Sequence, residues 1–298
     1  MSTDFLCASG KIQDKKNTNV IIDENGTPSA TLKELLLVAE IDHDGSLPSI
    51  VNVTQKAWLE LIRPNNKERW EINQEIINKF EKNREQFLKL FRQLDISEKL
   101  SPLQNHYTYA VLLGSTLKSF CKRLGYLIEL SKAGIIFDEL VTLAGERPLL
   151  QKENKAVFLS MLKTTLPGRI GVELLEEFPT NEADMMEYVL KYVELPETLR
   201  SSIVMIRVPM KINNTGALVR PTTADTVIEW LKAKPKLGSI LALSSQPYCA
   251  YQSSVLKTFM PEFIIETVGK AAKHDTSIAL YLDSLGRFLF QENKRLEI

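Results

Sequence analysis

The sequence predicts an α/β protein of Rossmann-like type, with a mainly parallel sheet of five or more strands and helices on both faces. After residue 101, short apolar runs alternate with helical patterns of about 12 or more residues, which is the order that parallel strands and their crossover helices produce. The runs are apolar nearly throughout, as in strands that helices cover on both faces. The predicted strands are 109–113, 137–145, 201–209, 238–245 and 262–269.

The segments between and after these strands carry helical signals. A helix from Leu117 to Ala133 is expected to stop at Gly134, because glycine readily takes the left-handed conformation that follows a helix. Thr180, with Asp184 four positions later, is expected to begin one helix, and Thr222 or Thr223 is expected to cap the next. The remaining predicted helices are 248–260 and 276–293, and TLPGRIG, which begins at Thr165, is expected to be a loop.

The part of the chain before residue 101 is predicted to be an appendage. Residues 1–27 are expected to form a flexible arm, or an edge strand at most, and 28–100 a helical subdomain. In that subdomain a short helix begins near Thr31, Thr54 is expected to cap a second helix that ends before Pro64, and an amphipathic helix runs from Glu68 to about Leu94. The aromatic stripe of this last helix is interpreted as core, with a partner-binding surface as the alternative.

The composition bears on four properties of the protein: nucleic-acid binding, membrane insertion, the state of its thiols and histidine-based chemistry. The 37 basic and 37 acidic residues cancel, so no global field favours nucleic acid or an anionic membrane, and nucleic-acid binding is not expected. No stretch of about 18 apolar residues predicts a membrane span. The three cysteines, Cys7, Cys121 and Cys249, are far apart, which favours reduced thiols and a cytoplasmic location. The three histidines are isolated, so a histidine-based metal site or a Ser-His-Asp triad is not expected.

In parallel sheets, ligands bind beyond the carboxyl ends of the strands, so polar residues at the predicted strand ends are the candidate site. Gly114, Ser115 and Thr116 follow the first strand and precede a helix, where backbone N–H groups and hydroxyls can hold an anion. Ordinary N-capping is the alternative for these residues. The sequence contains neither GxGxxG nor GxxxxGK[ST], which disfavours a standard dinucleotide fold or a P-loop.

Three charged residues are the candidates for catalysis. Glu146 and Arg147 follow Gly145 at the end of the second strand, and Glu182 opens the next helix. Arg147 can clamp an oxyanion with two hydrogen bonds, and either glutamate can act as a base. The alternatives are a surface ion pair for Glu146 and Arg147, and a helix-start preference for Glu182.

Further candidate ligand-binding residues lie after the third and fourth strands. Arg220 and Thr223 stand before a helix and repeat the combination of a cation with hydroxyls at a helix start. Hydroxyl, amide and phenol groups after the fourth strand can hydrogen-bond a base or sugar, with capping as the alternative. These last residues are Ser244, Ser245, Gln246 and Tyr248.

In their order, the segments GST, LAGERPL, TNEADMM, RPTTADT and LSSQPYCAYQ resemble the YdcF/SanA-like family of uncharacterised bacterial α/β proteins, over about residues 107–290. The resemblance implies a Rossmann-like domain over 101–298 that binds a nucleotide-type ligand such as S-adenosylmethionine, with no settled reaction. Family members often carry a histidine and then an arginine where this chain has Tyr248 and Tyr251. Chemistry that needs that pair would be altered here.

The function expected from the sequence is binding of a nucleotide or another anionic small molecule at the strand ends. If the protein is an enzyme, transfer or hydrolysis at a phosphate or nucleotide is expected, with Glu146 or Glu182 as base and Arg147 stabilising negative charge. The alternative is a non-catalytic scaffold that docks a protein partner through residues 28–100.

Overall fold

The computed structural model describes residues 21–62, 74–166, 177–213 and 216–297. It confirms the predicted α/β class, with a five-stranded sheet in the order β3-β2-β1-β6-β7 and every neighbouring pair parallel. The strands are β1 (His106–Leu113), β2 (Ile136–Gly145), β3 (Ile203–Val208), β6 (Ser239–Ser245) and β7 (Ile264–Lys270). Each predicted apolar run therefore forms one strand of the sheet.

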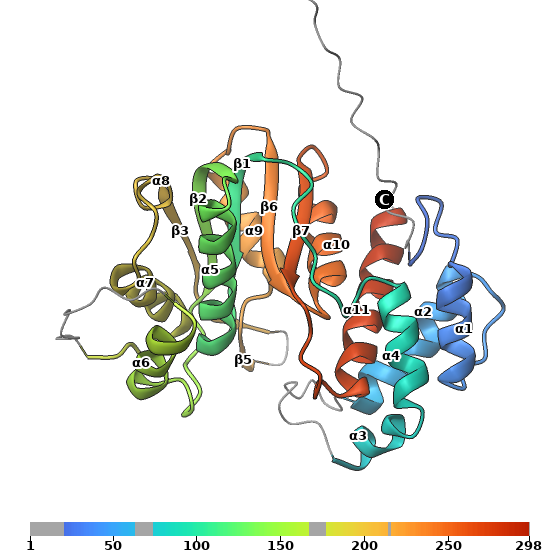
Figure 1. Ribbon diagram of the computed structural model, residues 1–298. Coiled ribbons are helices and arrows are strands. Elements are labelled where there is room, and N and C mark those ends of the chain that lie inside the picture. The colour runs from blue at the N-terminus through green and yellow to red at the C-terminus, as the bar shows by residue number, and fades with distance from the viewer. Residues whose placement is uncertain (1–20, 63–73, 167–176, 214–215, 298) are drawn as a thin grey trace, which may run out of the picture.

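Alternate residues of the strands enter two different cores because successive side chains of a strand point to opposite faces. Ala110 and Leu112 of β1 pack with α5 (Leu117–Lys132), α6 (Lys155–Thr164) and α7 (Glu182–Tyr192). Tyr109, Val111 and Leu113 pack with α9 (Thr223–Lys232) and α10 (Cys249–Phe259) on the other face. The sheet is thus covered on both sides, and Figure 1 shows α5 on one face with α9 and α10 behind the sheet.

The N-terminal helices share a third core with the last helix of the chain. The cluster contains Leu32, Trp58 and Phe91 from the N-terminal part together with Tyr281 and Leu285 from α11. The rings of Phe91 and Tyr281 stack with 4.4 Å between centroids. The helices involved, which lie beyond the β7 edge in Figure 1, are α1 (Ala30–Val38), α2 (Leu47–Thr54), α3 (Gln74–Glu81), α4 (Arg84–Gln93) and α11 (Ile278–Leu296).

Two details of the N-terminal part differ from the sequence-based expectation. Thr54 does not cap a helix: it ends α2, its hydroxyl donates to the carbonyls of Ile50 and Val51, and the chain continues as a π-helical segment, η1 (Gln55–Glu60). Ser46, whose side chain accepts from Ser49 N–H, caps α2 instead. The amphipathic segment expected from Glu68 to Leu94 is divided between α3 and α4, and its first residues lie outside the described ones.

Three short elements complete the described chain. The loop after β3 contains a small hairpin of β4 (Lys211–Ile212) and β5 (Leu218–Val219), and α8 (Glu197–Arg200) precedes β3. Most of the expected TLPGRIG loop, like residues 1–20, lies outside the described residues. Among the helices that are described, none is long and apolar enough to cross a membrane.

Candidate functional site

A cavity of about 210 Å³ opens at the carboxyl edge of the sheet, where the sequence analysis placed the site. The end of β1, the end of β2 and the starts of α7, α9 and α10 line it, and α11 closes one side. The chain continues from β1 to β2 on one side and reaches β6 on the other, so the strand order reverses between β1 and β6. Ligands of open parallel sheets bind at such a reversal, which makes this cavity the candidate functional site.

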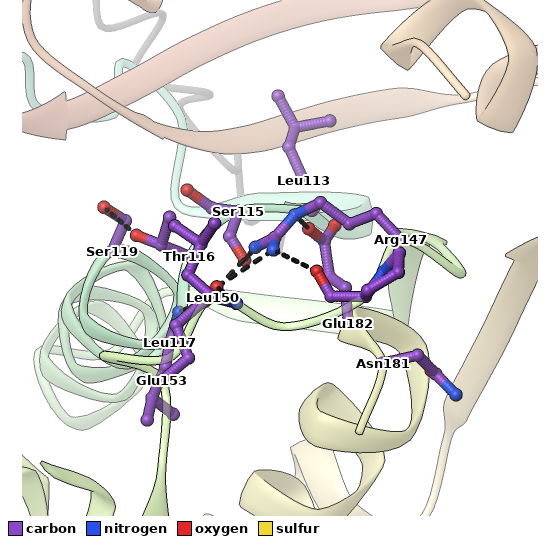
Figure 2. Close-up of polar contacts among 12 residues, drawn as sticks. Leu113, Ser115, Thr116, Leu117, Ser119, Arg147, Leu150, Glu153, Asn181 and Glu182 are labelled. Carbon is purple, nitrogen blue, oxygen red and sulfur yellow. Dashed lines mark hydrogen bonds and ion pairs between the residues drawn. The ribbon is translucent and has the colours of Figure 1, made fainter. Parts of the chain in front are cut away.

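A buried ion-pair network forms one wall of the cavity. Arg147 places Nε 2.5 Å from Oε2 of Glu182, while its two Nη atoms donate to Glu153 at 2.9 and 3.1 Å. Arg147 Nη2 also donates to the carbonyl of Ser115, which ties the end of β2 to the turn after β1. Figure 2 shows the guanidinium group of Arg147 between these partners. Arg147 therefore links three segments that are far apart in sequence.

Glu153 is itself held by the backbone. Its carboxylate accepts from Leu117 N–H at 2.7 Å and from Leu150 N–H at 2.9 Å, in addition to Arg147. Leu117 is the first residue of α5, so Glu153 supplies the negative charge at this helix start. Gly114 N–H donates to Leu143 O. Two of the N–H groups near the turn that was predicted to hold an external anion thus bind groups of the protein itself.

The pKa values of Glu153 and Glu182 are shifted in opposite directions, although both carboxyl groups contact Arg147. Burial acts to raise the pKa of Glu153, but hydrogen bonds from Arg147 and the backbone outweigh burial and hold that pKa below its usual value. Burial raises the pKa of Glu182 above its usual value, although Arg147 and Arg220 act in the opposite direction. Arg147 keeps a raised pKa because its carboxylate partners outweigh the burial of its charge. Glu153 is therefore the firmly ionised partner of Arg147.

Three more arginines line the cavity. Arg123 of α5 donates to the carbonyls of Leu113 and Gly114 at 2.8 and 3.3 Å. Arg287 of α11 donates from Nε to both carboxylate oxygens of Asp283 at 3.2 and 3.3 Å. Arg220 follows the β4–β5 hairpin and is exposed. With Arg147, four arginines from different parts of the chain line one cavity.

Because Gly114 has no side chain, Glu182 can pack directly against the turn after β1. A Cβ there would collide with a carboxylate oxygen of Glu182 and lie 2.9 Å from Leu143 O. At Gly145 a Cβ would come within 2.5 Å of the ring of Pro221, so this glycine lets the loop before α9 approach the end of β2. Close backbone approach, rather than unusual backbone angles, is the role of both glycines.

The structure brings most of the sequence-predicted site residues together. Those that line the cavity are Gly114, Ser115, Thr116, Gly145, Arg147, Glu182, Arg220, Thr223 and Tyr248. Thr222, the other candidate cap, forms a capping box with Asp225, and Thr223 is the first residue of α9. The hydroxyl of Thr116 donates to Ser119 and does not cap α5.

Four predicted residues lie apart from the cavity lining. Glu146 pairs with Arg207 at 3.2 Å on the surface. Gln246 turns toward the N-terminal helices, where its amide donates to the carbonyls of Asp95 and Glu98. The other two are Ser244, which is buried, and Ser245, whose hydroxyl lies 3.5 Å from Nε of Arg123.

Residues that the sequence analysis missed are Arg123, Glu153, Asp283 and Arg287. Arg123 lies between Phe120 and Leu124 on the buried face of α5, so a charge at a core position was the available signal. Asp283 and Arg287 form an i, i+4 pair in an otherwise apolar stretch. Glu153 lies in a polar turn and gives no comparable signal.

The described residues contain no group of three or more His, Cys, Asp or Glu side chains placed to hold a metal ion. Comparison with known proteins gives no match to a family model, to a curated protein or to a solved structure. The resemblance to the YdcF/SanA-like family therefore stays a prediction from the motifs.

Proposed function

We propose that this protein binds an anionic small molecule, nucleotide-type or other, at the carboxyl ends of β1, β2 and β6. The observation that supports the proposal most directly is the convergence of Arg123, Arg147, Arg220 and Arg287 on one cavity. Planar guanidinium groups recognise carboxylate and phosphate oxygens with paired hydrogen bonds, and they recur where anions are bound.

Binding, rather than a particular reaction, is what the geometry favours. Arg147 and Glu182, the candidate oxyanion clamp and base, neutralise each other in a buried pair. Glu146, the other candidate base, pairs with Arg207 outside the cavity lining. A phosphate- or nucleotide-directed transferase or hydrolase would need a base other than these two, or a rearrangement that frees Glu182.

The resemblance to the YdcF/SanA-like family, whose members are thought to bind S-adenosylmethionine, adds that compound to the candidate ligands. A cytoplasmic location is part of the proposal. Cys121 and Cys249 are buried free thiols, and burial raises the pKa of each to about 12, as is typical of unreactive cysteines in a reducing compartment.

A thermal-shift panel on the full chain tests the proposal. The panel contains inorganic phosphate, AMP, ATP and S-adenosylmethionine, with Arg287→Gln as the site variant and Arg207→Gln as the matched surface control. A ligand at 100 times its Kd stabilises the folded state by about 2.7 kcal/mol, which raises Tm by several degrees. Stabilisation of the parent and of Arg207→Gln, but not of Arg287→Gln, supports the proposal. No shift with any compound overturns it in favour of a scaffold role.

A further inference from the structure

Five lysines lie together on the outer face of α5 and around the carboxyl end of β7. Lys118 and Lys122 are exposed one turn apart on α5, which lies in front of the sheet in Figure 1. Lys270 is the last residue of β7, Lys273 follows in the next loop, and Lys99 belongs to the segment after α4. None of the five lines the cavity, so they form a separate feature, which we name the lysine surface.

The ring of Tyr126 connects three segments at this surface. Nζ of Lys99 lies 5.0 Å and Nζ of Lys270 5.8 Å from the centre of the ring. The hydroxyl of Tyr126 donates to the carbonyl of Leu100 at 2.8 Å, which holds the segment after α4 against α5. Lys122 is one turn before Tyr126 on the same helix. Lysines that are far apart in sequence are thus fixed side by side.

The lysine surface has an excess of positive charge. Lys270 pairs with Glu129 at 2.6 Å, whereas the other four lysines form no ion pair within the described part of the chain. Burial and the charges of three nearby lysines lower the pKa of Lys122, and Asp275 acts in the opposite direction. The whole chain has no net charge, so this excess is local. The three lysines that act on Lys122 are Lys118, Lys270 and Lys273.

The chemistry of the surface favours carboxylates over phosphates as partners. Its cations are lysines, whereas the planar fork of arginine is the side chain best suited to phosphate and nucleic-acid recognition. Proteins that bind single-stranded nucleic acid stack its bases on aromatic side chains, but Tyr126 is only 1% exposed. Neither α5 nor residues 265–277 carry an exposed large apolar side chain, which a helix needs in order to insert into a lipid surface.

The dimensions of the surface suit a short segment of another protein. Lys118, Lys122 and Glu129 are spaced along about 16 Å of α5, at a rise of about 1.5 Å per residue. Carboxylates about one helical turn apart can meet the two lysines of α5, while Lys270 and Lys273 lie to the side. Contacts between exposed charges are weak one by one, but together they steer association and make it sensitive to salt.

We propose that the lysine surface binds an acidic segment of a partner protein, held mainly by charge. The proposal goes beyond the proposed function, because it concerns a protein partner on a surface that is separate from the cavity and does not depend on the cavity ligand.

Fluorescence anisotropy of the full chain with a labelled poly-glutamate peptide of about 20 residues tests the proposal, because such a peptide is long enough to span the surface. Poly-dT of similar length and vesicles with about one-third phosphatidylserine represent the two phosphate-bearing alternatives. We expect poly-glutamate to bind at least about tenfold more tightly than poly-dT, and we expect the vesicles not to co-sediment the chain. The affinity for poly-glutamate should fall as salt is added, because salt screens exposed charges.

Charge-reversal variants assign the binding to the surface. Lys118→Glu combined with Lys122→Glu should weaken poly-glutamate binding by at least about tenfold, because two attractions become repulsions. Lys33→Glu combined with Lys236→Glu is the matched control: it changes the net charge equally at two exposed lysines of other elements, and should weaken binding less than about threefold. The pair of Ala substitutions at 118 and 122, which keeps good helix formers in α5, should give an intermediate loss and checks that the reversal does not act through folding.

Three outcomes overturn the proposal. If poly-glutamate does not bind, or if the site and control variants lose the same affinity, the lysine surface is not a docking surface. If poly-dT or the vesicles bind more tightly than poly-glutamate, the partner carries phosphate groups. Each of these outcomes leaves anion binding at the cavity intact, because the thermal-shift panel with Arg287→Gln tests that proposal separately.

Discussion

Nε of Arg147 lies 2.5 Å from a carboxylate oxygen of Glu182, and both side chains are more than nine-tenths buried. These residues come from the end of β2 and the first position of α7, which the sequence singled out as oxyanion clamp and base. The pair joins the two elements under the turn after β1. The ion pair has a structural role, because it holds together one wall of the cavity that the other three arginines also line.

Replacement of Arg147 by Gln should destabilise the protein strongly. The substitution leaves Glu153 and Glu182 buried without the guanidinium group between them, and loss of one partner of a buried ion pair costs about 3–5 kcal/mol. Urea unfolding followed by circular dichroism measures the change in the free energy of unfolding.

Arg207→Gln is the control for this experiment. Arg207 also contacts acidic residues at the carboxyl edge, but its side chain is 37% exposed, so its loss should cost less than about 1 kcal/mol. If both variants lose the same free energy of unfolding, the burial of Arg147 does not have the structural importance assigned to it.

Gly114→Ala should disturb the same cavity wall, because residue 114 lies against Glu182. The new Cβ would collide with Glu182 and lie 2.9 Å from the carbonyl oxygen of Leu143, which belongs to a rigid strand. We expect a loss of about 1–3 kcal/mol, typical of overpacking, together with weaker binding of any cavity ligand. Gly286→Ala is the matched control, because its Cβ would meet the flexible end of Leu59 at 3.3 Å. If Gly114→Ala has the same Tm as the parent in thermal unfolding, Glu182 can move away from the new Cβ at little cost in stability.

The sequence predicted the fold because the signals that define it are local. Each strand is a continuous apolar run, and each is followed by a helical pattern with a recognisable start or stop, such as Gly134 at φ +94° after α5. The break between α3 and α4 and the continuation of α2 through Thr54 were missed, because caps and breaks depend on which side-chain bonds the tertiary contacts permit.

From the sequence, the candidate site could be predicted only as the group of polar residues that follow the strands. The rule for parallel sheets placed Gly114, Arg147, Glu182 and Arg220 together without any knowledge of their contacts. Glu153 could not be found this way, because a glutamate in a polar turn resembles any surface glutamate until Arg147 is seen beside it. Arg287 comes from a helix that shares its core with the N-terminal helices, a long-range arrangement that local patterns do not encode.

Gln246 was predicted to bind ligand, and its contacts predict a structural role instead. Its amide donates to Asp95 O at 2.7 Å and to Glu98 O at 3.0 Å, which connects the end of β6 to the segment after α4. Gln246→Ala should remove about 1–3 kcal/mol of stability by leaving these carbonyls without that donor. Ligand binding at the cavity should be unchanged, because Gln246 lies apart from the cavity lining. Urea unfolding measures the loss of stability, and the thermal-shift panel measures ligand binding; a ligand-binding defect in Gln246→Ala would restore the sequence-based assignment.

The two glutamates beside Arg147 should give opposite dependences of stability on pH. The pKa of Glu153 is lowered on folding, so its contribution is present above its usual value of 4.5 and is lost as the pH falls toward the folded-state value. The pKa of Glu182 is raised, so its contribution is present below 4.5 and is lost as the pH rises through the folded-state value. Glu153→Gln should therefore cost about 3 kcal/mol at pH 7 and progressively less in acid. Glu182→Gln, which resembles the protonated acid, should become less harmful relative to the parent as the pH rises from 4 to 7. Urea unfolding of the parent and both variants across this range measures the difference, and parallel curves for the two variants would contradict the assignment of Glu153 as the ionised partner of Arg147.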